Sequence, residues 1–579
     1  MRNFSTSRWR APAEWAAAAA TGALLWGAMP PAPLGADAAW FGMVPLLLAV
    51  RHAAPRRAFR LGLASGAVFW LLSLTWIWRL IENNGPWPLV VFGYAALAAY
   101  CALYTALFCL AVARVWQVVR LRENEALRLL AAAVAEPLLW VGAEFLRCTL
   151  LTGFPWHALG VSQYANLVML QAASLGGVYA VSALVVLVNG AVAGLAVRMV
   201  RMASAPAGRR PPGGAWRSFE TFVPLLILAV AWMWGLQRVR ERAQAGADAP
   251  VWRLAMIQPD APCIFARNDE NADLARRTLL DLTRAASANR PDLVIWPETA
   301  LLGDVPSDPS AMSLAGNGAV AAGAPLLTGA TETRAGPSGR PGDTVFYNSA
   351  WLFNAGGLPA GFYRKQHLVP FGEFIPLDGV FPALQRLSPV GISCTPGRSS
   401  SVLHVVGRPP PRGGPLTVSL EEPAARAPLA FSPLICFEDT VSDLSRRAVR
   451  AGARLLVNVS NDSWFRGSNE PEQHLAQAIF RCVETGVPMA RAANTGVSAA
   501  IDGIGRRTLL TAADGGTSGF AGHLDASLAV PENPPPTPYL RHGDWLLGRP
   551  AAIVLLLVLA APLVRRRSER FHPEGNKHE

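Results

Sequence analysis

Long apolar stretches alternate with short arginine-bearing segments over the first 240 residues. Each stretch approaches the roughly 20 mostly apolar residues that a helix needs to cross a bilayer. We predict eight membrane-spanning helices, at about 12–29, 36–50, 59–80, 87–113, 127–146, 165–197, 219–237 and 547–564. The second stretch is short for a span, and the sixth is long enough to be tilted or broken at Gly176-Gly177.

Basic residues favour alternate connections between these spans. The N-terminus, the connections after the second, fourth and sixth spans, and the tail after the eighth are rich in arginine, whereas the intervening short connections hold only Arg79 and Arg147. Because basic loops tend to stay in the cytoplasm, we predict that both termini are cytoplasmic. The long segment after the seventh span is then extracytoplasmic, although Arg238, Arg240 and Arg242 at its start run against the pattern.

Between residues 245 and 530 the pattern becomes that of a soluble α/β domain. Short apolar runs, such as 254–257, 293–296 and 455–459, alternate with amphipathic helical patterns, such as 269–288 and 472–485. The Gly/Pro/Ser-rich segment 303–318 is predicted to be a surface loop. We therefore expect the following parts: a seven-helix membrane domain at 1–240, a catalytic domain at 245–530, a proline-rich linker at 531–546, a membrane helix at 547–564 and a cytoplasmic tail at 565–579.

Composition supports a membrane protein. Hydrophobic residues make up 51% of the chain and charged residues 16%, against about 25% charged in average globular chains. The net charge of +12 does not indicate nucleic-acid binding, because the basic residues do not form a patch interleaved with aromatic residues. The sequence also shows no phosphate-cradling glycine loop and no His/Cys cluster with metal-ligand spacing, so neither a metal nor another cofactor is expected.

Cys436 is the first candidate for chemistry. The apolar run 429–435 leads to it, and a helical pattern begins at Thr440. A turn between a strand and a helix can hold a thiol beside backbone N–H groups, which would lower its pKa and produce a nucleophilic thiolate. Taken alone, however, a cysteine in this setting is more often a small buried hydrophobe.

Glu298 and Lys365 strengthen the functional interpretation. Glu298 ends the apolar run 293–297, again at a turn. The chain has 52 lysines and arginines, but only two are lysines, Lys365 and Lys577. A lysine kept in a chain that otherwise uses arginine indicates a tight site that requires a compact ammonium rather than a planar guanidinium.

These three residues resemble the Glu-Lys-Cys triad of the nitrilase superfamily in type, order and flanking words, which read W-P-E, Y-x-K-x-H-L-V-P-F-G-E and I-C-x-E. A domain of this kind between seven spans and an eighth is similar to the apolipoprotein N-acyltransferase family of bacterial inner membranes. Six further segments resemble that family: 144–147, 152–156, 458–465, 473–475, 491–496 and 537–539. One departure is Phe437, where the family often has tyrosine.

The resemblance implies an αββα sandwich for the catalytic domain and a role for each residue of the triad. Glu298 would be the general base, and Cys436 would carry the acyl group as a thioester. Lys365 and a backbone N–H near Phe437 would stabilise the oxyanion.

Other residues in the matching segments have two interpretations each. Glu373 and Glu438 would orient the triad, or else form ordinary surface ion pairs. Trp464 and Phe465 would line the acyl entrance, or else pack within their loop. Glu144 and Arg147 would pair with each other, or else meet a lipid headgroup.

The resemblance also implies the substrates and the location. The donor would be a membrane phospholipid such as phosphatidylethanolamine, and the acceptor the N-terminal amine of a diacylglyceryl apolipoprotein. The protein would be a monomer in the bacterial inner membrane, with its catalytic domain on the periplasmic side. Two alternatives remain at this point: a membrane-tethered nitrilase or amidase that hydrolyses a small C–N substrate, and a catalytically inactive scaffold.

Overall fold

The computed structural model describes residues 7–83, 85–122, 124–204, 219–263, 269–301, 303–336, 344–376, 393–399, 401–407 and 427–571. The chain forms two compact units. Unit 1 comprises Met1–Ile77, Pro88–Gln237 and His542–Glu579, and unit 2 comprises Trp78–Trp87 and Arg238–Arg541. A short segment from the N-terminal third of the chain therefore belongs to the same unit as Cys436.

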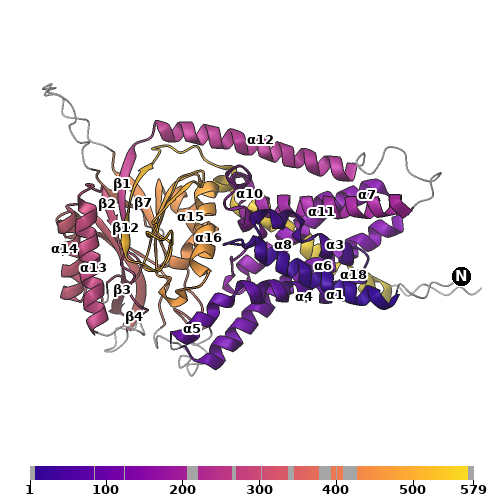
Figure 1. The fold of residues 1–579 in the computed structure, drawn as a ribbon, viewed down its shortest axis with the longest axis horizontal. Coiled ribbons are helices and arrows are strands. Elements are labelled where there is room, and N and C mark those ends of the chain that lie inside the picture. Colours follow the sequence, from indigo (N-terminus) through magenta and orange to yellow (C-terminus); the bar gives the residue numbers. More distant parts are fainter. Residues whose placement is uncertain are drawn as a thin grey trace, which may run out of the picture. The chain divides into compact units, whose positions relative to one another are not determined.

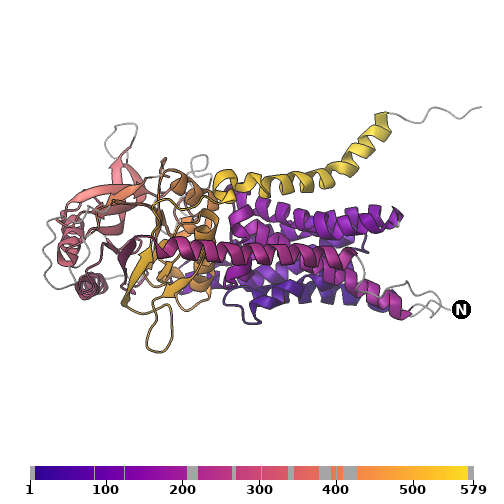
Figure 2. The ribbon, with the colours of Figure 1, turned by 90° about the horizontal axis from the view of Figure 1, so that it is seen from above.

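Unit 1 is helical, and its long helices run side by side in two perpendicular views (Figure 1 and Figure 2). Its elements are α1 (Ser7–Ala28), α2 (Ala39–Gly42), α3 (Val44–Val50), α4 (Pro55–Ser73), α6 (Trp87–Arg122), α7 (Glu125–Leu130), α8 (Glu136–Thr149), α9 (Leu167–Leu170), α10 (Ala173–Gly176), α11 (Val178–Ser204), most of α12 (Phe219–Ala247) and α18 (Gly548–Phe571).

Five helices in the described part of the chain are long and apolar enough to cross a membrane, and a sixth is obtained if the pair Pro55–Ser73 and Thr75–Glu82, bent by 50°, counts as one span. Ala36–Val50 and Leu167–Gly176 form shorter apolar helices. The predicted break at Gly176-Gly177 is confirmed, because α10 ends at Gly176 and Gly177 takes a φ of 69° before α11 begins. The count of eight spans stays a prediction.

A buried ion pair lies inside unit 1. Arg51, which the sequence places in a basic connection, is 2% exposed, and Glu136 at the start of α8 is 1% exposed. Arg51 Nε and Nη2 donate to the two carboxylate oxygens of Glu136 at 2.8 and 2.6 Å. Arg51 therefore serves as a packing group within the bundle, because a buried cation requires a matched anion.

Within the described residues, unit 2 contains two six-stranded sheets, with strand orders β12-β1-β2-β3-β4-β5 and β11-β10-β9-β8-β7-β6. The strands β1, β2 and β3 run parallel in the first sheet, as β7, β8 and β9 do in the second. The strands are β1 (Val251–Gln258), β2 (Leu293–Ile295), β3 (Leu326–Ala335), β4 (Thr344–Phe353), β5 (Pro359–Arg364), β6 (Leu403–Val405), β7 (Leu429–Ile435), β8 (Leu455–Ser460), β9 (Met489–Ala493), β10 (Ala499–Ile501), β11 (Arg507–Leu509) and β12 (Gly522–Ala529).

The two sheets share one hydrophobic core. Leu254 and Ile295 from the first sheet pack in the same cluster as Phe431 and Val457 from the second. Figure 1 shows α13 (Asp269–Ser287) and α14 (Pro309–Ala322) outside the first sheet, and α15 (Ser442–Arg450) and α16 (Glu470–Thr485) outside the second. The central parallel strands are buried on both faces, so they appear in the sequence as continuous apolar runs.

The prediction of a loop at 303–318 is wrong, because α14 occupies most of that segment. Asp308 caps the helix by accepting from Ser310 N–H at 2.8 Å, and Gly323 ends it in a left-handed conformation. Ala311, Ala315 and Ala319 form its buried face. The small residues that made the segment look like a loop allow this helix to lie close to the sheet.

The segment predicted as a linker at 531–546 contains a short helix, α17 (Pro538–His542), and a 3₁₀ turn at Gly543–Trp545. Helix α18 runs beyond residue 564, to Phe571. The predicted ends of the last span therefore differ from those of the helix, because its arginine-rich end continues the helical backbone after the apolar stretch stops.

Candidate active site

The ends of three strands hold the predicted triad in unit 2. Glu298 lies three residues beyond the end of β2, Lys365 directly follows β5, and Cys436 directly follows β7. The first two strands belong to one sheet and the third to the other. The packing of the two sheets on one core brings these strand ends together.

Lys365 is the centre of the charged part of the site. Its ammonium Nζ lies 2.8 Å from Glu373 Oε1 and 3.4 Å from Glu298 Oε1, and the residue is 1% exposed. Burial lowers the pKa of Lys365, but the nearby carboxylates of Glu373 and Glu298 outweigh burial and hold that pKa well above its usual value. The ammonium is therefore permanently charged at neutral pH.

Asn348 on β4 completes this arrangement, although no sequence pattern singles it out. Its amide Nδ2 donates to Glu298 Oε1 and to Glu373 Oε1, both at 2.7 Å. An asparagine in a strand has no distinguishing sequence pattern, so only the tertiary structure identifies it. The amide and the ammonium together fix the positions of two carboxylates that would otherwise repel each other.

Cys436 lies at the first position of the 3₁₀ turn Cys436–Thr440 and has a φ of 52°. Such a φ is costly for a residue with a Cβ, by about 1–3 kcal/mol. The turn places the thiol beside Glu298 and Lys365, and both groups act on it electrostatically. The surrounding structure must therefore hold the turn in place.

The pKa of the Cys436 thiol is raised to about 12, chiefly by burial and further by Glu298, against the opposing effect of Lys365. The expectation of a lowered pKa is thus wrong: removal from water outweighs the favourable charge of the lysine. The resting thiol is neutral, so attack on a substrate requires a base that takes its proton.

Glu298 is placed to be that base. Burial raises the pKa of its carboxyl group, Lys365 opposes this shift, and Glu373 adds to it. A carboxylate with a raised pKa is a stronger base than one in water. The pair of Glu298 and Cys436 can therefore exchange a proton at the moment of attack.

Among the described residues, Glu373 and Glu438 bind Lys365, Asn348 and backbone N–H groups rather than loop arginines. Glu373 accepts from Val369 N–H at 2.9 Å in addition to its contacts with Lys365 and Asn348. Glu438 is fully buried and accepts from the backbone N–H groups of Ile435, Gln366 and His367 at 2.8, 2.6 and 3.0 Å. One carboxylate thus ties the segment before Cys436 to the segment after Lys365.

The aromatic candidates lie close to the turn and in a neighbouring loop. The Phe437 ring stacks on His367, with ring centroids 5.9 Å apart. Trp464 and Phe465 belong to the 3₁₀ turn Ser463–Phe465 and are half-buried. The Trp464 carbonyl accepts from Asn83 Nδ2 at 2.9 Å, which links this loop to the N-terminal segment of unit 2. A role of Trp464 and Phe465 in acyl entry stays a prediction.

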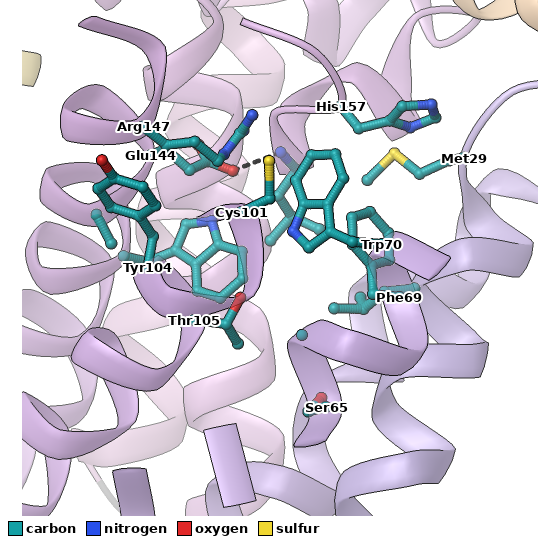
Figure 3. Close-up of a pocket in the computed structure, with 15 residues that line it drawn as sticks. Met29, Ser65, Phe69, Trp70, Cys101, Tyr104, Thr105, Glu144, Arg147 and His157 are labelled. Atoms are coloured by element: carbon teal, nitrogen blue, oxygen red, sulfur yellow. Dashed lines mark hydrogen bonds between the residues drawn. The ribbon is translucent and has the colours of Figure 1, made fainter. Parts of the chain in front are cut away.

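Glu144 and Arg147 lie in unit 1, where both are buried and line one cavity (Figure 3). Arg147 Nη1 donates to the carbonyls of Phe154 and Trp156 at 2.6 and 2.7 Å, and Glu144 Oε1 accepts from Leu159 N–H at 2.6 Å. These contacts fold the segment that follows α8 back onto the helix. They describe a structural role within unit 1, and lipid binding by the two residues stays a prediction.

A cluster that the sequence did not reveal lies behind the Cys436 turn. Oxygen and nitrogen atoms of Asp462, Glu470 and His474 come within 4.8 Å of one another, a spacing that a metal ion could use. The guanidinium of Arg491 already pairs with Asp462, at 3.1 Å, and contacts His474. Because a cation occupies this position, the residues suit an ion-pair network better than a metal site.

Two family models match this chain. Residues 21–191 match the family described as "Apolipoprotein N-acyltransferase N-terminal domain", and residues 253–519 match the family described as "Carbon-nitrogen hydrolase". The second match confirms the predicted nitrilase-like domain.

Full-length relatives are also similar. A protein of Geobacter metallireducens named apolipoprotein N-acyltransferase is 33% identical over 480 residues, covering 82% of each chain. Another so named, from Bradyrhizobium diazoefficiens, is 34% identical over 495 residues, covering 84% of this chain and 81% of its own. Among solved structures, an amidase of the nitrilase superfamily from Nesterenkonia matches 52% of this chain and 96% of its own, at 20% identity and a TM-score of 0.33.

Proposed function

This chain belongs to the apolipoprotein N-acyltransferase family, and from that premise we propose how its residues transfer a fatty acyl chain to the N-terminus of an apolipoprotein. The observation that carries the proposal is the placement of the neutral Cys436 thiol beside the Glu298 carboxylate, which also pairs with Lys365.

In the first half-reaction, Glu298 takes the proton of the Cys436 thiol as the sulfur attacks the ester carbonyl of a phospholipid. The C–S bond forms and the carbonyl oxygen becomes an oxyanion. Lys365 and a backbone N–H near Phe437 stabilise the negative charge on that oxygen. Collapse of the intermediate breaks the ester C–O bond, Glu298 returns the proton to the leaving oxygen, and a lysophospholipid departs.

In the second half-reaction, the amine of the acceptor attacks the Cys436 thioester. Glu298 takes a proton from the amine, the C–N bond forms, and the thiolate leaves and is reprotonated by Glu298. Lys365 again stabilises the oxyanion. The products are the N-acylated lipoprotein and the starting enzyme, so the residues of the site suffice for proton transfer in both steps.

The substrates and the setting follow from the same premise. The donor is a phospholipid of the phosphatidylethanolamine kind, and the acceptor is the α-amino group of a diacylglyceryl cysteine. The protein acts as a monomer in the bacterial inner membrane. It has eight spans, both termini in the cytoplasm and an αββα catalytic domain on the periplasmic side. The match of residues 21–191 to the N-terminal domain of this family favours this reaction over hydrolysis of a small soluble amide.

The test is an intact-mass measurement on the purified full-length protein incubated with phosphatidylethanolamine and no acceptor. We expect one acyl chain on Cys436, labile to neutral hydroxylamine. A diacylated lipopeptide with a free N-terminus should discharge it, and one with a blocked N-terminus should not. If no acyl-enzyme appears and transfer requires both lipids at once, the assignment of Cys436 as nucleophile fails.

A further inference from the structure

Five buried charged side chains lie directly behind the Cys436 turn. They are Asp439 in the turn itself, Asp462 after β8, Glu470 and His474 on α16, and Arg491 on β9, and each is at most 3% exposed. None of them has a part in the two half-reactions described above. Burying so much charge is costly unless the geometry is well satisfied.

One guanidinium in this cluster reaches both ends of the turn. Arg491 Nη1 donates to the carboxylate of Asp439, the fourth residue of the turn. The same Nη1 donates to Asn458 Oδ1 at 2.9 Å, and Asn458 Nδ2 donates to the Cys436 carbonyl at 3.0 Å. Arg491 therefore holds the end of the turn directly and its beginning through Asn458.

The remaining members of the cluster fix the guanidinium. Arg491 Nη2 donates to Asp462 Oδ2 at 3.1 Å, and Arg491 Nε donates to the Val497 carbonyl at 3.2 Å. His474 lies between the acidic groups, with Nε2 2.9 Å from Asp439 and Nδ1 3.3 Å from Asp462 and 3.4 Å from Glu470. Burial and Arg491 lower the pKa of His474, but Asp439 and Asp462 outweigh them and raise it well above its usual value.

This support acts where the backbone needs it. Cys436 has a φ of 52°, and a strained residue keeps its conformation only when surrounding contacts hold it there. Arg491 Nη1 makes both contacts to the turn, while Nη2 and Nε hold the guanidinium to Asp462 and the Val497 carbonyl. Contacts spread over three nitrogens in one plane require an arginine, because an ammonium has only one nitrogen.

We propose that Arg491 is a positioning residue for acyl transfer, which clamps both ends of the Cys436 turn and so fixes the thiol against Glu298 and the donor ester. The proposal rests on the role of Cys436 in the proposed function. Arg491 touches neither the substrate nor the reacting atoms, and it acts through Asp439 and Asn458.

The test compares Arg491→Lys, Asn458→Ala and the double variant in the full-length, detergent-solubilised protein. Asn458→Ala removes the link to the Cys436 carbonyl and leaves the ion pairs of Arg491 in place. The matched control is Arg51→Lys, which weakens an equally buried arginine–carboxylate pair in unit 1. Acyl-enzyme formation from phosphatidylethanolamine is followed by intact mass across lipid concentrations, and alkylation of Cys436 by iodoacetamide is followed across pH.

We expect Arg491→Lys to slow acyl-enzyme formation roughly 100-fold at saturating lipid, the loss typical of a small misplacement of a reacting group. The half-saturating lipid concentration should stay the same, and the pH profile of alkylation should shift. Asn458→Ala should form the acyl-enzyme more slowly than wild type. The double variant should be no slower than Arg491→Lys alone, because both residues support the turn through the same chain of hydrogen bonds. Arg51→Lys should leave both rates per folded molecule unchanged.

Wild-type rates per folded molecule in Arg491→Lys would overturn the proposal. It would also be overturned if the rate reduction in the double variant equals the product of the two single reductions. If Arg491→Lys does not fold, Asn458→Ala provides the test. A wild-type rate of acyl-enzyme formation in Asn458→Ala would show that the proposed support of the turn does not affect the reaction. A wild-type protein that forms no acyl-enzyme would instead defeat the nucleophile assignment. Alkylation needs no lipid, so equal alkylation rates in wild type and Asn458→Ala would still overturn the clamp in that case.

Discussion

The two units bury positive charge in different ways. In unit 1, Arg51 faces a single carboxylate, that of Glu136, which also accepts from the Trp116 indole N–H at 2.8 Å. The Trp116 ring lies 4.6 Å from the guanidinium carbon. In unit 2, the single ammonium of Lys365 faces the carboxylates of Glu298 and Glu373 and acts electrostatically on the Cys436 thiol.

The difference separates a structural ion pair from a reactive one. The pair in unit 1 is matched, one cation to one anion, so the two buried charges neutralise each other. The group in unit 2 has an excess of carboxylate in a buried setting, which makes protonation of Glu298 easier and gives the site a base. The balance of charge, rather than burial alone, therefore distinguishes the site.

The largest expected effect comes from Cys436→Ala. Acyl-enzyme formation should fall to background because the nucleophile is gone, while folding and membrane insertion should persist because the side chain is small and only partly buried. Intact mass after incubation with phospholipid measures acyl-enzyme formation, and thermal unfolding measures whether the variant is folded. Cys394→Ala, a second partly buried cysteine of unit 2, is the control and should retain the acyl-enzyme. Failure of Cys436→Ala to fold would make this cysteine structural.

A reciprocal exchange tests the comparison next. Lys365→Arg should reduce turnover by roughly 100-fold or more, the size of losing an oxyanion donor, because the wider guanidinium displaces the groups around it. Arg51→Lys should lower the melting temperature, through loss of about 1–3 kcal/mol of buried hydrogen bonding, and leave turnover per folded molecule unchanged. The measurements are single-turnover transfer and thermal unfolding for both variants. Near-normal turnover in Lys365→Arg would contradict the inference, drawn from the rarity of lysine, that the site requires a compact ammonium.

Asn348→Ala should have an intermediate effect, visible in the pH dependence. Below its raised pKa, Glu298 is protonated and cannot accept the thiol proton, so the rate of acyl-enzyme formation should fall as pH falls through that value. The Asn348 hydrogen bond opposes the rise of this pKa. Its loss should therefore move the acid limb to higher pH and reduce the rate about 10-fold. An acid limb in the wild-type position would show that Asn348 does not tune the base.

The smallest expected effect concerns Glu470, whose pKa burial and Asp462 raise from 4.5 to about 7. A carboxyl group with a raised pKa in the folded state stabilises the protein below its unfolded pKa, and this stability is lost as pH rises from about 4.5 to 7. Glu470→Gln removes this titration, because an amide has no proton to lose at these pH values. The stability of the variant relative to wild type should therefore be greater at pH 8 than at pH 5. Thermal unfolding at the two pH values measures this. If the stability difference between variant and wild type is the same at both pH values, Glu470 does not titrate in this range as assigned.

The sequence determined the division into apolar helices and an α/β domain, because membrane spans and buried parallel strands leave long runs of apolar residues that are visible without a structure. It also selected Glu298, Lys365 and Cys436: Glu298 and Cys436 each follow an apolar run, and Lys365 is one of only two lysines in the chain. The break at Gly176-Gly177 was likewise foreseeable, because glycine readily takes the positive φ that ends a helix.

Only the tertiary structure decided how those residues behave. The thiol pKa is raised rather than lowered because burial, which depends on the packing of two sheets, outweighs the lysine beside it. No local pattern marks Asn348. Asn458 and Arg491 begin segments that resemble the family, but only the tertiary contacts show that they support the Cys436 turn. Helix α14 was missed because its small residues match a loop by composition, and only the adjacent sheet shows what they pack against. Local patterns report what a segment buries, whereas charge balance and support of a strained turn arise from contacts between segments.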